Sequence, residues 1–315
     1  MSKNMIQFQP GMSLTAFLKQ YGTDEQCREA LYEWRWPKGY ECPNCGHHSA
    51  CKLKNRQLYQ CNRCHHQSSV IAGTIFQDTK LGLSVWFLGI YFITQSKNGI
   101  SALALSRHLG ISYNAAWRMK HKLMQVMLER DNEKPLQGRV EMDDSYWGGE
   151  RHGGKRGRGA EAKKPFVAAV QTTEDEKPLK MKLSVVVGFQ SEEISKWSQR
   201  HLLPASTVVS DGLACFNAVT DIGCEHEVHI VGSGPKSVEH PAFHWVNTML
   251  GNVKNAMRGT YHAIQAKHLP RYLAEFHYRF NRRYDLPSII PRFLYVAVRT
   301  PPMPQQLLTM AETRW

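Results

Sequence analysis

The sequence lacks any apolar run long enough to cross a membrane. Its longest stretch without a charged residue runs from Leu81 to Ser96 and contains the polar residues Ser84 and Gln95. A membrane-spanning helix needs roughly 20 predominantly apolar residues, so we expect a buried helix here and no membrane association. The N-terminus, Met1–Asn4, has no apolar core followed by small residues, so the sequence shows no secretory signal.

Acidic residues are few relative to basic ones. Asp and Glu number 27 against 40 Lys and Arg, which gives a formal net charge of +13. This surplus favours an anionic partner, most often nucleic acid and sometimes an acidic membrane surface. A basic protein whose charge serves only solubility is the alternative. With 315 residues, 42 % of them hydrophobic, the chain is long enough for one large domain and one or two small ones.

Cysteine is scarce, and half of the cysteine residues lie in two close pairs. Four of the eight cysteines form the pairs Cys42 with Cys45 and Cys61 with Cys64, separated by fifteen residues. In a chain without an export signal, this pattern favours metal ligation over disulfides. Each pair directs two thiolates at one ion, and two pairs complete a closed tetrahedral Zn²⁺ site that is structural and not catalytic. A redox pair or incidental cysteines are the alternatives.

The residues around these cysteines predict the local fold. Lys52-Leu53 and Leu58–Gln60 suit the two strands of a hairpin, so we expect a zinc ribbon over residues 37–75. Residues 1–36 are expected to form a helical lead-in, because apolar side chains recur there at loosely helical spacing and Trp36-Pro37 provides a stop.

Residues 76–135 are expected to be helical and to bind DNA. Ile100–Ser112 has the pattern of the first helix and turn of a helix-turn-helix, with Gly110 at the turn and Ser112 as cap of the next helix. A plain helical hairpin packed on the core is the alternative. If the motif is real, the second helix offers these candidate contacts to the major groove: Tyr113, Asn114, Arg118 and Lys122.

A basic glycine-rich segment occupies residues 148–159. Its glycines oppose regular structure, so its cations would be free to wrap a phosphate backbone. We therefore expect Lys155, Arg156 and Arg158 to contact DNA.

Residues 136–292 alternate strand and helix patterns, and a Pro-rich tail, 293–315, follows. Three strands are expected over Val140–Tyr146, Pro165–Thr172 and Met181–Gly188. Next come a helix over Ser191–Leu203, capped by Ser191, and a fourth strand over Thr207–Ser210. The order β-β-β-α-β-α is that of an RNase H-like fold with a mixed sheet. The chain as a whole is therefore expected to be multidomain, of α+β and α/β class.

Two aspartates stand where strands of such a fold end. Asp143 ends the alternating run Arg139–Asp143, Asp211 follows the β-branched run Thr207–Ser210, and thirty-five residues separate Asp211 from Asn247. Lys254 lies seven positions after Asn247, so both share one face of a helix, roughly 10 Å apart along its axis. Such groups can hold two hard cations about 3.5–4 Å apart. Because Asp-Gly is also an ordinary turn signal, a non-catalytic or decayed site is the alternative.

Together with the ribbon, several blocks of the sequence resemble a known family. The chain resembles bacterial insertion-sequence transposases that have a zinc ribbon and an RNase H-like, DDE-type catalytic domain. The resemblance covers roughly residues 11–290 and is specific through the combination of its blocks. These blocks are Val140–Gly149, Ser210–Gly212, Trp245–Lys254, Arg258–His262 and Tyr272–Arg283.

The resemblance implies a metal triad of Asp143, Asp211 and Asn247, with Lys254 as a DNA-contacting cation and Arg258 continuing that side. Some members carry Asn where others carry Glu. An Asn side chain offers one neutral carbonyl oxygen and no negative charge. We therefore expect the second metal ion either to be bound more weakly or to have the assistance of a further ligand. The candidates for assistance are Asp144, Glu141, Glu239 and a DNA phosphate.

The expected activity is cleavage and joining of DNA strands by two Mg²⁺ or Mn²⁺ ions. The expected partners are the transposon ends and target DNA, with a homodimer or higher oligomer because two ends must be held together. The expected location is the bacterial cytoplasm, at the nucleoid. Two other functions remain open: a DNA-binding regulator with an inert RNase H-like domain, and a structure-specific nuclease without strand transfer.

Overall fold

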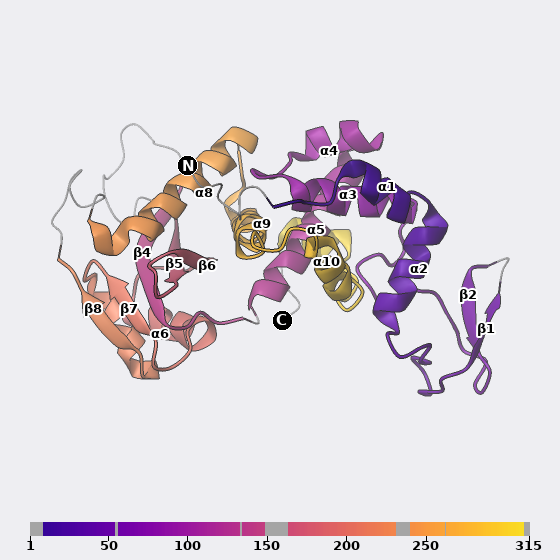
Figure 1. Ribbon diagram of the computed structural model, residues 1–315, viewed down its shortest axis with the longest axis horizontal. Helices are drawn as coiled ribbons and strands as arrows, with labels where there is room; N and C mark the ends of the chain where they lie inside the picture. The colour runs from indigo at the N-terminus through magenta and orange to yellow at the C-terminus, as the bar shows by residue number, and fades with distance from the viewer. Residues whose placement is uncertain are drawn as a thin grey trace. The chain divides into compact units, whose positions relative to one another are not determined.

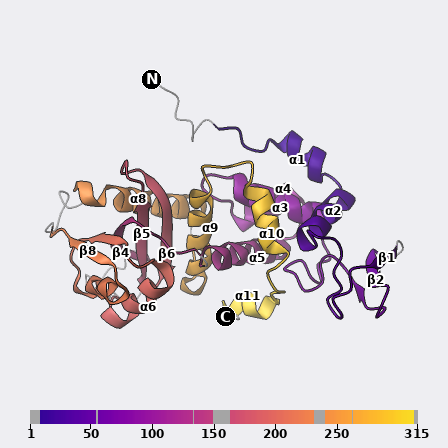
Figure 2. The same cartoon turned by 60° about the horizontal axis from the view of Figure 1, so that its bottom comes forward.

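A computed structural model describes residues 9–53, 56–132, 134–148, 163–230, 240–261 and 263–311 (Figures 1 and 2). The chain folds into two compact units. Met127–Arg283 forms one unit, and the other combines the chain up to Val126 with the chain from Tyr284 onward. Within the described residues, no helix has the length and apolar character that crossing a membrane would require.

The N-terminal lead-in is two helices, α1 (Leu14–Tyr21) and α2 (Asp24–Arg35). The chain breaks between them because Thr23 forms a capping box with Gln26: the Gln26 N–H donates to the Thr23 hydroxyl at 3.2 Å, and the Thr23 N–H donates to the Gln26 side chain at 3.0 Å. This pair was not recognised in the sequence, where the region was treated as one helical segment.

The zinc ribbon is a three-stranded antiparallel sheet in the order β1-β2-β3. Its strands are β1 (Ala50–Leu53), β2 (Leu58–Cys61) and β3 (Gln67–Ser68), so the predicted hairpin is confirmed. The rings of Trp36 and Tyr40, with centroids 5.0 Å apart, pack together, and Tyr59 of β2 lies 5.0 Å from Tyr32 of α2. This aromatic cluster gives α2 and the ribbon a shared core.

Three helices follow: α3 (Leu83–Gln95), α4 (Ala102–Leu109) and α5 (Tyr113–Asn132). The turn between α4 and α5 has the predicted chemistry. Gly110 adopts a left-handed conformation (φ +64°), which favours glycine, and the Ser112 hydroxyl accepts the N–H of Ala115 at 3.2 Å.

The C-terminal region is helical, contrary to the expected Pro-rich tail. Its helices are α10 (Ile289–Ala297) and α11 (Gln305–Met310), so the boundary placed before residue 293 falls inside α10. Ile290, Phe293 and Leu294 are buried, and α10 packs against α2 and α3. The apolar face of α10 completes the core of the first unit, and the prolines Pro301, Pro302 and Pro304 follow the end of this helix.

The second unit contains a five-stranded mixed sheet in the order β6-β5-β4-β7-β8. The central strand β4 (Arg139–Trp147) pairs antiparallel with β5 (Lys164–Thr172) and parallel with β7 (Thr207–Ser210). β6 (Pro178–Val185) pairs antiparallel with β5, and β8 (Glu225–Val228) pairs parallel with β7. This topology is RNase H-like, as predicted, although the short polar edge strand β8 was not foreseen.

Helices cover both faces of this sheet, with α6 and α8 on opposite sides (Figure 1). One face packs against α6 (Ser191–His201) and the 3-10 segment η1 (Ala214–Ile222). The other packs against α8 (His244–Thr260) and α9 (Leu269–Asn281), each preceded by a short 3-10 turn, η2 (Pro241–Phe243) and η3 (Ala266–His268). The cap of α6 is Gln190, so the prediction of Ser191 was wrong by one residue.

Candidate active site

Three carboxylates converge beside the centre of the sheet. Asp143 and Asp144 belong to β4, and Asp211 directly follows β7. The parallel register pairs Glu141 with Val209, so Asp143 and Asp211 continue two paired strands in the same direction. One carboxylate oxygen from each aspartate lies within 4.8 Å of the others. The structure thus brings Asp143 and Asp211 together as predicted, with the candidate Asp144 beside them, but Asp143 lies in the middle of β4 and not at a strand end.

The pKa of Asp143 is raised by burial and by the crowding of these acids. Burial raises the pKa of Asp143 to about 7, and the negative charges of Asp144 and Asp211 add to this shift. The Asp144 N–H, which donates to Asp143 Oδ1 at 2.8 Å, and the Lys254 cation act in the opposite direction. Negative charge therefore exceeds positive charge in the cluster. Its carboxylate oxygens are ligands that hard divalent cations prefer.

The turn that carries Asp211 is held by its own hydrogen bonds. The Leu213 N–H donates to Asp211 Oδ1 at 3.0 Å, and the Gly212 N–H donates to the Ser210 hydroxyl at 3.2 Å. Ser210 Oγ lies 2.8 Å from Nε2 of His226 on β8. Sequence reasoning missed Ser210 and His226, because β8 itself had no recognisable strand pattern.

Helix α8 brings a polar and basic side to this region. Asn247 lies in its first turns and is half-buried, Lys254 is half-buried, and Arg258 is exposed near its end. Burial lowers the pKa of Lys254, while the nearby charges of Asp143 and Asp144 partly offset that shift. Lys254 thus belongs to the electrostatic environment of the carboxylate cluster.

The first turn of α8 is attached to β4 through Glu141. Its Oε2 atom accepts the backbone N–H groups of both Trp245 and Val246, each at 2.8 Å. Burial raises the pKa of Glu141 to about 7, although these two hydrogen bonds lower it. Glu141 therefore contacts the helix that carries Asn247 and is not among the three clustered acids.

The predicted DNA contacts have different surroundings. Arg118 is exposed on α5, with Tyr113 and Asn114 one turn earlier. Lys122, by contrast, donates to the carbonyl oxygen of Ile75 at 3.0 Å, and burial lowers its pKa. The sequence pattern overstated the availability of Lys122, because its ammonium group is bonded to the backbone of Ile75 within the same unit. Lys155, Arg156 and Arg158, like Glu239, lie outside the described residues.

The four ribbon cysteines form the second metal-ligating group. Their sulfur atoms lie within 4.8 Å of one another, and Cys42 to Cys64 and Cys45 to Cys61 measure 3.6 Å each. A tetrahedral Zn²⁺ with Zn–S bonds of about 2.3 Å requires sulfur separations of about 3.8 Å. The donor set and its spacing fit structural zinc.

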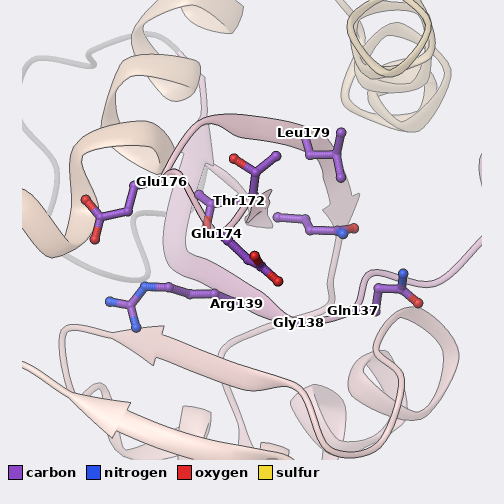
Figure 3. A pocket seen from close by; sticks show the side chains of 9 residues that line it. Gln137, Gly138, Arg139, Thr172, Glu174, Glu176 and Leu179 are labelled. Carbon is purple, nitrogen blue, oxygen red and sulfur yellow. The ribbon is translucent and has the colours of Figure 1, made fainter.

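A pocket of 650 Å³ opens at the start of β4, four residues before Asp143 (Figure 3). It is lined by charged side chains of both signs, including Arg139, Glu174 and Glu176, and by the largely buried Gln171 and Thr172. Arg139 is already paired with Glu227 at 2.6 Å. The pocket thus has neither the acidic cluster nor the basic helix face of the candidate site.

The raised pKa of Asp143 predicts a stability effect in protein without divalent metal added and with zinc retained. An acid whose folded-state pKa is raised contributes stability below its ordinary pKa and loses it as pH rises through the folded value, here about 7. We expect Asp143→Asn to melt about 5 °C above wild type near pH 8, and we expect this difference to be smaller near pH 5, closer to the ordinary pKa of the aspartate. Calorimetry at both pH values measures this. An Asp143→Asn variant that is no more stable near pH 8 would contradict the carboxylate repulsion.

The chain is similar to a curated protein of a transposable element and to solved transposase structures. A protein of the transposable element ISH50 from Halobacterium salinarum is 26 % identical over 133 residues, covering 41 % of this chain and 44 % of the relative, less than half of that protein's length. Two Mos1 transposase structures, a mariner paired-end complex with Mn and a paired-end complex with the left transposon end, are 11 % identical over 63 % of this chain and 77 % of theirs. Their TM-scores of 0.21 and 0.22 are too low for an element-by-element comparison.

Two family models match the chain. The model described as an ISXO2-like transposase domain matches residues 135–281, which contain the sheet, the three aspartates and α8. The model described as a transposase zinc-ribbon domain matches residues 22–67, which contain all four clustered cysteines and the α2 helix that shares the ribbon's core. The two matched segments together make up more than half of the chain. The chain therefore belongs to the insertion-sequence transposases that combine a zinc ribbon with an ISXO2-like, DDE-type transposase domain.

Proposed function

We propose that this protein cleaves the ends of its insertion sequence and joins them to target DNA in a reaction that depends on divalent metal. The observation that carries this proposal is the convergence of Asp143, Asp144 and Asp211 within 4.8 Å on the sheet of a transposase domain. Oxygen ligands arranged in this way are suited to Mg²⁺ or Mn²⁺. Two bound ions would activate the attacking oxygen and stabilise the leaving oxygen.

The residues of this chain would have separate tasks in that reaction. Asp143 and Asp211 would hold the metal ions from two paired strands, and Asn247 would offer a neutral carbonyl oxygen from α8. Asp144 would supply the third negative charge that Asn247 lacks, because it lies in the same cluster. Although burial lowers the pKa of Lys254, the charges of Asp143 and Asp144 act to raise it, because its ammonium group lies near the cluster. Lys254 would pair with a DNA phosphate beside the ions.

DNA binding would use surfaces outside the carboxylate cluster. Arg118 on α5 and Arg258 on α8 are exposed cations, and the net charge of +13 favours a polyanionic partner. Lys155, Arg156 and Arg158 would add phosphate contacts. We further propose a dimer or larger assembly at the nucleoid in the cytoplasm, since two transposon ends must be cut and joined together.

Replacing Asn247 tests whether a neutral ligand limits the site. We expect Asn247→Asp to retain or increase metal-dependent cleavage, because it adds a charged oxygen ligand where the amide has a neutral one. Asn247→Leu, similar in size and without a polar atom, is the matched control and should cleave less than wild type. The rate of end cleavage is measured across a Mn²⁺ series. Faster cleavage by Asn247→Leu than by Asn247→Asp would exclude Asn247 as a ligand.

The activity itself is tested with DNA from the ends of the element. Wild type and Asp211→Ala are incubated with a terminal-repeat duplex, a target plasmid and Mn²⁺, and cleaved and joined products are separated. Metal-dependent cleavage by wild type, but not by Asp211→Ala, would distinguish a transposase from a DNA-binding regulator. Joining of the cleaved end to the target distinguishes it from a nuclease. Cleavage at equal rates by both proteins would refute the assigned site.

A further inference from the structure

We propose that Glu141 is a positioning residue of the active site, which fixes the first turn of α8, and therefore Asn247, against the strand that carries Asp143. The inference rests on the proposed function for its catalytic meaning, but not for its geometry. Glu141 precedes Asp143 by two residues on β4, so both side chains project from the same face of the strand. Only 4 % of Glu141 is exposed.

The attachment reaches across a long stretch of sequence. Helix α8 begins after Phe243, which cannot supply a side-chain cap, so its first N–H groups need another acceptor. Glu141 Oε2 accepts the N–H groups of Trp245 and Val246 at 2.8 Å each. Asn247 is the next residue along the helix, and the carboxylate also has the sign that favours a helix N-terminus.

Trp245 is held at a second point. Its indole Nε1 donates to the carbonyl oxygen of Glu176, in the turn between β5 and β6, at 2.5 Å. The start of α8 is thus bonded to two separate parts of the sheet. A local Ser or Asp cap would satisfy the same N–H groups without burying a carboxylate. A cap that comes from β4 additionally sets the position and rotation of the helix relative to Asp143.

The charged residues near Glu141 have other partners, so its carboxylate bonds to α8. Arg139, on the same face of β4, directs its guanidinium at Glu227 at 2.6 Å, and Glu227 also contacts His229 at 2.6 Å. Within the described residues, the acids close enough to share an ion with Asp143 are Asp144 and Asp211. Glu141 therefore acts on the metal site through α8 and not as a ligand, in contrast to the direct assistance considered from the sequence.

The test measures Mn²⁺ binding to the full chain by the electron paramagnetic resonance signal of free Mn²⁺, which does not depend on cleavage. We expect Glu141→Ala to raise the Mn²⁺ dissociation constant about tenfold, as loss of an orienting partner commonly does. Glu141→Gln, whose amide oxygen can accept the same two N–H groups, should restore most of the affinity. Hydrogen exchange of the first turn of α8 should accelerate in Glu141→Ala and not in Glu141→Gln.

The control is Asn281→Ala, which removes two side-chain hydrogen bonds to the Met181 backbone, at 2.7 and 3.0 Å, elsewhere in the same unit. It should lower the melting temperature without changing Mn²⁺ affinity. If Glu141→Ala does not fold, Glu141→Asp, shorter by one methylene, takes its place, with a smaller loss of affinity expected. Equal Mn²⁺ affinities in wild type and the folded Glu141 variants would overturn the inference. If the Glu141 variants change the Mn²⁺ affinity as expected but the wild-type protein cleaves no DNA, the proposed function alone would be refuted.

Discussion

Asp143→Ala is expected to reduce metal-dependent end cleavage by more than about a thousandfold while DNA binding persists. Asp143 has the central place in the carboxylate cluster: burial and the charges of both other aspartates raise its pKa, and Lys254 opposes them. Removing it leaves the strand side of the site with one acid from β4 and one from the turn after β7. Under the proposed function, the remaining carboxylates would be too few to hold two divalent ions.

The measurement is the rate of cleavage of an end-labelled terminal-repeat duplex in Mn²⁺, with binding of the same duplex measured separately. Asp221→Ala provides the control, because Asp221 is an exposed aspartate of η1 in the same unit. It should cleave at the wild-type rate. Cleavage by Asp143→Ala within a factor of about three of wild type would place the chemistry elsewhere.

Cys61→Ser is expected to abolish zinc binding and unfold the ribbon. The three strands are short, and Cys61 is fully buried beside Cys45, so a zinc ion bound by the four cysteines would hold the hairpin turns together. Structural zinc sites contribute about 10–16 kcal/mol of binding energy to folding, far more than so small a sheet can replace. The second unit has its own core and should retain its melting transition.

Zinc content by mass spectrometry and amide exchange of the ribbon strands measure this effect. Cys51→Ser is the matched control, because Cys51 lies in β1 of the same hairpin but is exposed and outside the four-cysteine group. It should retain one zinc per chain and a protected hairpin. If Cys61→Ser kept its zinc, or if Cys51→Ser lost it, the assignment of the four ligands would be wrong.

The predictable parts of this protein are those whose signals are local. The cysteine spacing predicted the ribbon and its hairpin, and Gly110 with Ser112 predicted the turn between α4 and α5 because each acts within a few residues. Runs rich in β-branched and aromatic residues predicted β4, β5 and β7. Since the order of strands and helices along the chain is that of an RNase H-like fold, the approach of Asp143 to Asp211 could also be predicted.

The remaining features depend on contacts between distant segments. Nothing near Glu141 in the sequence indicates that it accepts hydrogen bonds from Trp245 and Val246, more than a hundred residues later. Lys122 has the spacing of a groove-facing cation, yet its ammonium donates to Ile75, which tertiary packing alone brings there. The helix α10 was obscured by the prolines beyond it, because its partners α2 and α3 lie near the other end of the chain.

The central claim, that the aspartate cluster holds the catalytic cations, is tested most directly by locating Mn²⁺ through its anomalous scattering in crystals of the protein with end DNA. We expect Mn²⁺ in contact with the carboxylates of Asp143 and Asp211 in wild type, and no Mn²⁺ at that position in Asp143→Ala. Crystals of cleavage-competent protein in which Mn²⁺ occupies another site and leaves these carboxylates without an ion would contradict the account.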